Sequence, residues 1–139
     1  MTKLASGTFE VKMLPQPPEA NVGDASIGRT ALEKIFSGDL DASSKGQMLA
    51  VRTPVDGSAG YVAMERVSGT LHGRRGTFAL QHSGSMAQGA QSLSITVVPD
   101  SATGELVGLS GALAIKIVDG QHHYAFEYLL SESPLPDDE

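Results

Sequence analysis

Residues 107–130, VGLSGALAIKIVDGQHHYAFEYLL, constrain the fold more than any other segment. Two runs rich in β-branched and aromatic residues flank Asp119-Gly120, and Asp-Gly suits a two-residue type I′ turn because both central positions need φ > 0. The turn predicts a β-hairpin in which Val118 pairs with Gln121. In that register one face of the hairpin is bulky and apolar, and the other is small and mostly polar.

Alternation of apolar and polar residues predicts several further strands. They span residues 4–13, 47–53, 60–72, 77–85 and 91–98. A chain of seven or eight strands joined by short turns must protect two sheet edges. Closure into an up-and-down barrel does so most completely, which favours a barrel over a sandwich.

The strands at 60–72 and 77–85 flank a four-residue loop and are expected to form a second hairpin. Pairing Leu71 with Thr77 would set Glu65 opposite Ser83. The same register would make Arg66 the neighbour of His82.

Residues 27–41 are ambiguous. Apolar residues at helical spacing follow Thr30, which with Glu33 imitates a capping box, so local signals favour a short helix. The alternative is a strand. In a strand, one face would consist of Leu32, Lys34, Phe36 and Leu40.

Composition narrows the class of protein. The 139 residues suit a single domain, expected at 1–131 and followed by an acidic, proline-broken, flexible tail at 132–139. A net charge of −6 with 5% aromatic residues argues against a nucleic-acid partner. No apolar run approaches the ~20 residues of a membrane span, so we expect a cytoplasmic protein without a membrane partner. Cysteine is absent, which excludes disulfides.

Several sequence blocks resemble a family of uncharacterised bacterial proteins, a domain of unknown function with an allene-oxide-cyclase-like β-barrel. The blocks are GTLHG at 69–73, GTFALQHSG at 76–84, VVPDSATGEL at 97–106, GLSG at 108–111, and residues 124–130. The resemblance implies an all-β, eight-stranded antiparallel barrel, often oligomeric, with residues 27–41 mostly extended. It implies no activity. Ala102 stands where the family usually has glycine, and it would be strained if that position needs φ > 0.

Glu65 is a candidate catalytic residue because it shares a strand face with Tyr61, Ala63 and Val67. Inside a barrel its carboxyl group would have a raised pKa and could act as general acid or base. The alternative is an outward carboxylate that is screened by water or paired with a neighbouring strand. Gln81 and His82 are candidate ligand-binding residues, and His82 could also move a proton or be an ordinary surface histidine beside Arg66.

Tyr124, Phe126 and Tyr128 form an aromatic row on the apolar face of the first hairpin. They predict core packing or a subunit interface, with the lining of an apolar ligand site as the functional alternative. His122 and His123 point to opposite faces of a strand and cannot chelate one ion, so no metal is expected. No sequence feature indicates a cofactor.

These patterns favour a small β-barrel that binds a hydrophobic or amphipathic small molecule without catalysis, since eight strands leave room for side chains or one small ligand. One alternative is an isomerase or cyclase that uses Glu65. The other is a purely structural barrel that forms homo-oligomers, because apolar residues occur on both faces of the strand at 60–72.

Overall fold

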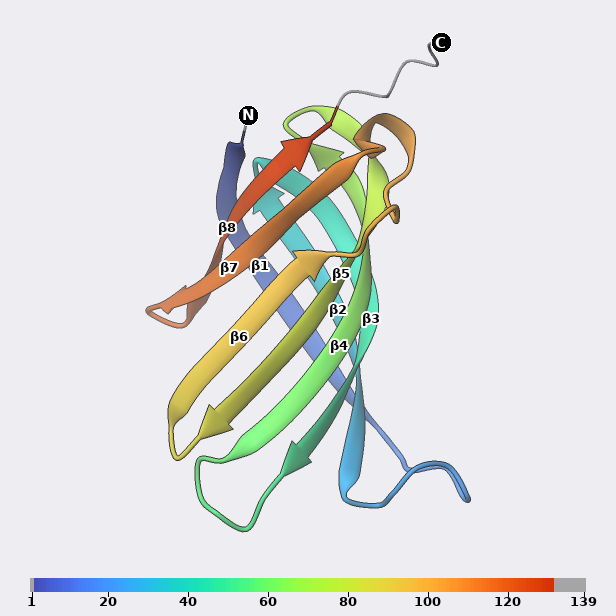
Figure 1. The fold of residues 1–139 in the computed structure, drawn as a ribbon, viewed down its shortest axis with the longest axis vertical. Coiled ribbons are helices and arrows are strands. Elements are labelled where there is room, and N and C mark those ends of the chain that lie inside the picture. Colours follow the sequence, from blue (N-terminus) through green and yellow to red (C-terminus); the bar gives the residue numbers. More distant parts are fainter. Residues whose placement is uncertain (1, 132–139) are drawn as a thin grey trace.

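A computed structural model describes residues 2–131, which form a closed barrel in which each strand pairs antiparallel with the next and β8 pairs with β1 (Figure 1). The elements are β1 (Lys3–Gln16), β2 (Ile27–Gly38), β3 (Leu40–Arg52), β4 (Ala59–Leu71), β5 (Arg74–Ala87), β6 (Ala90–Val97), the 3₁₀ helix η1 (Gly104–Leu106), β7 (Leu109–Val118) and β8 (Gln121–Leu130). The predicted eight-stranded barrel is confirmed. The predicted acidic tail lies outside the described residues. Within residues 2–131 no helix is long and apolar enough to cross a membrane.

The hydrophobic core fills only one half of the barrel. This upper half lies at the end that carries the β2–β3 and β4–β5 turns and η1, at the top of Figure 1. Its inward side chains are large and buried, and the Phe78 and Phe126 rings stack at 5.9 Å. The buried core consists of Ala5, Phe9, Phe36, Leu40, Ala42, Val67, Leu71, Phe78, Leu80, Ile95, Val97, Leu106, Leu109, Leu113, Tyr124, Phe126 and Tyr128.

Residues 27–41 are extended, so the helix favoured by local signals is wrong and the extended structure implied by the resemblance is right. Leu32, Lys34 and Phe36 are buried, while the residues between them are exposed. This period of two is that of a strand with one buried face. Because β2 pairs along its length with both β1 and β3, backbone hydrogen bonding within the sheet outweighs the weak helical signal.

The second hairpin forms, but its predicted register is wrong. Leu71 pairs with Arg74 rather than Thr77, because His72 and Gly73 alone make the turn, with φ of 48° and 80°. Two residues at positive φ suit a type I′ turn, whose twist matches the flanking strands. The three-residue difference is odd, so it moves His82 onto the same face as Glu65.

The first hairpin has the predicted register, with Val118 opposite Gln121. Asp119 and Gly120 both have positive φ, as a type I′ turn requires. Ala102 carries no such strain, because the left-handed residue in the preceding connection is Asp100.

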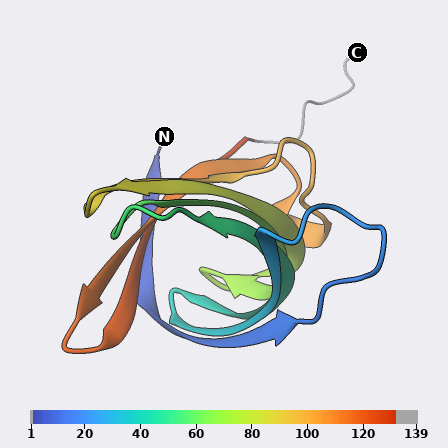
Figure 2. The same ribbon diagram turned by 90° about the horizontal axis from the view of Figure 1, so that it is seen from below.

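The β6–β7 junction is the weakest seam of the barrel. In the described structure these strands share one residue pair, Thr96 with Ala112, and below it the β7–β8 hairpin diverges from β6 (Figures 1 and 2). The barrel is therefore packed and closed at its upper end and loosely joined at its lower end.

Candidate functional site

The lower end of the barrel contains a cavity of about 310 Å³. Most of its lining residues occupy inward positions of β3, β4, β5 and β6, near the ends of these strands that lie at the bottom of Figure 1. The lining residues are Met48, Ala50, Arg52, Ala59, Gly60, Tyr61, Gly84, Ser85, Met86, Gln91, Ser92 and Leu93. We call this space the mouth cavity. Its size is at the small end of the range for ligand pockets.

Apolar side chains around the lower end are left uncovered. Met13, Leu93 and Ile117 lie on the inner face of their strands, yet they are 55%, 47% and 62% exposed. In the upper half the same face is buried. The lower barrel thus presents an apolar surface to whatever enters it.

Between the mouth cavity and the packed core lies a polar cluster formed by Lys34, Ser44, Glu65 and His82. Glu65 accepts hydrogen bonds from Lys34 Nζ at 2.8 Å, from His82 Nε2 at 2.5 Å and from Ser44 Oγ at 2.6 Å. The four residues come from four neighbouring strands and are all buried. The four side chains are buried and close to one another because each occupies an inward position of its strand.

The polar cluster holds Glu65 ionised. Burial raises the pKa of the carboxyl group, but the hydrogen bond from His82, the charge of Lys34 and the hydrogen bonds from Lys34 and Ser44 outweigh it and lower the pKa from 4.5 to about 2. The shift is opposite to the raised pKa expected for a carboxylate inside the barrel. A carboxylate this acidic is a weak base and carries no proton to donate at neutral pH.

His82 has a ring nitrogen that the cluster leaves without a partner. An ionised carboxylate can only accept, so His82 must carry a hydrogen on Nε2. Nδ1 has no hydrogen-bond partner within residues 2–131. The cluster can therefore orient the His82 imidazole and leave its Nδ1 able to accept a hydrogen bond or a proton.

Lys34 also contacts the faces of Phe9 and Phe36, with Nζ 5.1 and 6.0 Å from the ring centres.

Tyr61 separates the polar cluster from the mouth cavity. Along the inner face of β4, Glu65 is followed toward the lower end by Ala63 and then Tyr61. The Tyr61 ring covers Gly84 so closely that a Cβ at Gly84 would lie 2.4 Å from the ring, which explains the glycine. Burial, and secondly the charge of Glu65, raises the pKa of the Tyr61 hydroxyl.

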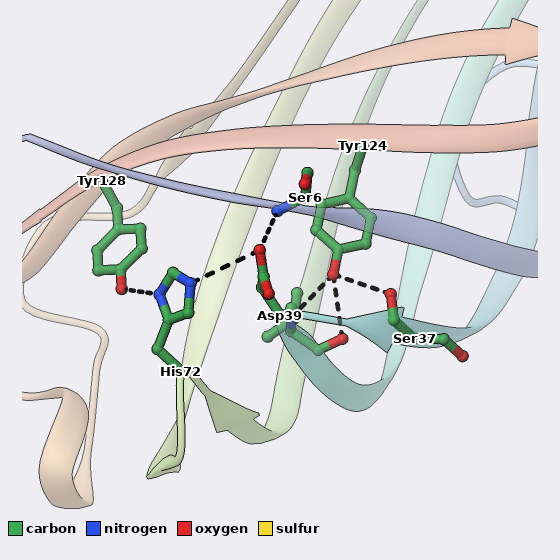
Figure 3. Close-up of polar contacts among 7 residues, drawn as sticks. Ser6, Ser37, Asp39, His72, Tyr124 and Tyr128 are labelled. Carbon is green, nitrogen blue, oxygen red and sulfur yellow. Dashed lines mark hydrogen bonds and ion pairs between the residues drawn. The ribbon is translucent and has the colours of Figure 1, made fainter.

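The predicted aromatic row lies in the packed core, away from the mouth cavity. Tyr124, Phe126 and Tyr128 are all buried. The Tyr124 hydroxyl accepts a hydrogen bond from the Leu40 N–H at 2.8 Å and lies 3.0 Å from the Ser37 carbonyl oxygen, to which it donates (Figure 3). These contacts fasten β8 to the β2–β3 turn.

A second polar network lies at the upper end. The Tyr128 hydroxyl is hydrogen-bonded to His72 Nδ1 at 2.5 Å, and His72 Nε2 lies 3.6 Å from an Asp39 carboxylate oxygen (Figure 3). The same oxygen accepts the Ser6 N–H. No sequence pattern groups these residues, because they come from four different strands or turns. The network fastens the upper end of the barrel, and its residues do not line the mouth cavity.

The structure brings together Glu65 and His82 but not the other predicted site residues. Gln81 is exposed on the outer face of β5, as expected for a residue next to an inward His82. Lys34 and Ser44 were missed as site residues. The signal for Lys34 was a charged residue on an otherwise apolar strand face. In residues 2–131 no three His, Cys, Asp or Glu side chains are grouped to hold a metal ion.

Comparisons with known proteins identify the family without giving it a function. A family model described as "Protein of unknown function (DUF3224)" matches residues 5–128. A crystal structure of a DUF3224 protein of unknown function from Shewanella oneidensis is similar, with 45% identity over 94% of this chain and 99% of that chain and a TM-score of 0.86. No curated protein matches. The chain belongs to the DUF3224 family.

Proposed function

We propose that this barrel binds a small hydrophobic or amphipathic molecule in its mouth cavity. The observation that carries the proposal is the uncovered apolar interior of the lower half, next to a cavity of about 310 Å³. Burial of apolar surface in such a cavity is favourable by about 25 cal/mol per Å² of surface removed from water. The polar cluster behind Tyr61 limits how far a ligand enters.

Isothermal titration with 1-octanol tests the proposal. Octanol is expected to bind the wild-type protein, and Ala50→Trp should abolish binding because the indole would fill the mouth cavity from the inner face of β3. Ser43→Trp is the matched control, since Ser43 is exposed on the outer face of the same strand. Absence of octanol binding to the wild type, or equal loss in both variants, would contradict the proposal.

An isomerase is the second candidate function, supported by the buried His82–Glu65 hydrogen bond. In this version His82 moves the proton and Glu65 orients the imidazole, because the ionised Glu65 is too weak a base. The reaction would remove a proton from the carbon beside a ligand carbonyl group and return it to another carbon, with no co-reactant.

Exchange of the α-protons of cyclohexanone in D₂O, followed by ¹H NMR, tests this second function. The wild type should accelerate exchange above buffer, His82→Gln should remove the acceleration, and His123→Gln, on the other face of β8 from Tyr124, should retain it. Exchange no faster than in buffer, or unaffected by His82→Gln, would exclude His82 from the role.

A homo-oligomer is a further proposal, supported by apolar residues on the outer face of the sheet. Leu49 and Val62 are cross-strand neighbours, Met64 lies beside them, and all three are exposed. Light scattering of the purified protein should give a mass that is a multiple of the 14.5 kDa chain mass. Val62→Asp should lower the measured mass toward that of a single chain. A monomer at micromolar concentration would argue against this proposal.

A further inference from the structure

The charge of the mouth cavity differs in sign from that of the whole chain. The chain has a net charge of −6, with 16 acidic and 10 basic residues. None of the residues that line the cavity is Asp or Glu, and its one charged lining residue is Arg52. The apolar cavity of this acidic protein thus has one charged lining residue, and that residue is cationic.

Arg52 has no competing partner in the described part of the chain. It occupies an inward position at the lower end of β3, opposite Ala59. No ion pair or hydrogen bond of its side chain occurs within residues 2–131, whereas Arg29 pairs with Glu19 and Arg66 donates to Thr77. The Arg52 guanidinium, a donor-only group, is therefore free to bind an acceptor.

The groups at the inner end of the cavity do not repel a negative charge. The Glu65 carboxylate lies behind Tyr61 and is compensated by the Lys34 ammonium at 2.8 Å. The Tyr61 hydroxyl, which is a potential donor, has no hydrogen-bond acceptor within residues 2–131. Arg52 is therefore the one charged group in the lining without a compensating partner within residues 2–131.

We propose that the ligand of the mouth cavity is an amphipathic anion, whose acidic group pairs with the Arg52 guanidinium while its apolar part occupies the cavity. This inference rests on the proposed function and specifies its ligand. A guanidinium pairs with a carboxylate through two parallel hydrogen bonds. A volume of about 310 Å³ holds roughly ten water-sized groups at ~30 Å³ each, which matches a carboxylic acid the size of octanoate.

Titration calorimetry with octanoate, 1-octanol and octylammonium tests the inference, because these probes share an apolar chain and differ in charge. At low ionic strength octanoate should bind about tenfold more tightly than octanol, and octylammonium most weakly. Added salt should weaken octanoate binding and leave octanol binding unchanged, since screening acts on the ion pair alone. Equal affinities for octanoate and octanol would overturn the inference and leave the proposed function intact. No binding of any probe would contradict the proposed function itself.

Substitutions of Arg52 test whether this residue causes the preference for octanoate. Arg52→Gln should reduce octanoate affinity about tenfold, and Arg52→Glu should make octylammonium the preferred probe. Arg75→Gln is the control, because it removes the same charge from an exposed position at the upper end of β5, and it should leave all three affinities unchanged. An octanoate preference that survives Arg52→Gln, or that Arg75→Gln removes equally, would overturn the assignment.

Discussion

At the scale of single residues, Glu65 links stability to pH. Its pKa falls from 4.5 unfolded to about 2 folded, so its contribution is complete above pH 4.5 and is lost as the pH falls toward 2. The shift corresponds to about 3 kcal/mol, at ~1.4 kcal/mol per unit. We expect Glu65→Gln to lower the free energy of unfolding by about 3–5 kcal/mol at pH 7, because the Lys34 ammonium would remain buried without its carboxylate.

Urea unfolding between pH 2 and 7 measures this effect. The difference between wild type and Glu65→Gln should shrink below pH 4.5, and adding Lys34→Met should recover part of the loss because the uncompensated charge is gone. Glu127→Gln, on the exposed face of β8, should change stability by less than about 0.5 kcal/mol. A Glu65→Gln protein as stable as the wild type would contradict the electrostatic role of the cluster.

The two buried tyrosines should respond differently to loss of their hydroxyl groups. Tyr124→Phe leaves the buried Leu40 N–H without its hydrogen-bond acceptor, which costs about 1–3 kcal/mol. Tyr128→Phe removes the partner of His72, but the half-exposed His72 side chain can hydrogen-bond to water instead. We therefore expect this substitution to lower the free energy of unfolding by about 1 kcal/mol. Thermal unfolding of both variants provides the comparison, and a larger loss for Tyr128→Phe would refute this ranking.

Sequence reasoning singled out Glu65 but left open whether its side chain faces the interior of the barrel, and it could not identify its partners. Strand alternation shows which residues of one strand share a face, whereas the meeting of Lys34, Ser44 and His82 depends on register across four strands. The error in the predicted register came from the β4–β5 turn. Reading His72 as part of a strand instead of a left-handed turn residue put His82 on the wrong face relative to Glu65.

At the scale of elements, turn chemistry determines strand register, and the β7–β8 turn allows a direct test. Gly120 has φ of 80° with open space where a Cβ would lie, so Gly120→Ala adds backbone strain alone. A loss of about 1–2 kcal/mol is expected. Gly28→Ala is the matched control, because Gly28 lies in β2 without positive φ and with no close contact. Similar effects of both substitutions on urea unfolding would argue against a strained turn.

The Asp-Gly hairpin could be predicted because its signal is local. Local signals did not predict the strand β2. Thr30 and Glu33 resemble a helix start, and only pairing with β1 and β3 makes residues 27–38 a strand. The family resemblance supplied this non-local information.

At the scale of the whole molecule, the barrel combines a packed upper half with a loosely joined lower half. Amide hydrogen exchange should be slowest in β4, which pairs along its length on both sides. It should be fastest, among strand residues, for the facing edges of β6 and β7 below the Thr96–Ala112 pair. Equal protection of the β6–β7 seam and the β4–β5 pair would contradict the open lower end.

The central claim is that the open lower end of the barrel holds a small molecule, and amide chemical-shift mapping with octanoate tests it most directly. The account predicts saturable shifts at the lower ends of β3, β4, β5 and β6, around Arg52, Tyr61 and Met86, which line the mouth cavity. Residues of the upper core, such as Phe78 and Phe126, should not shift. Saturating octanoate that leaves the mouth residues unshifted, or shifts centred on another surface, would contradict the claim.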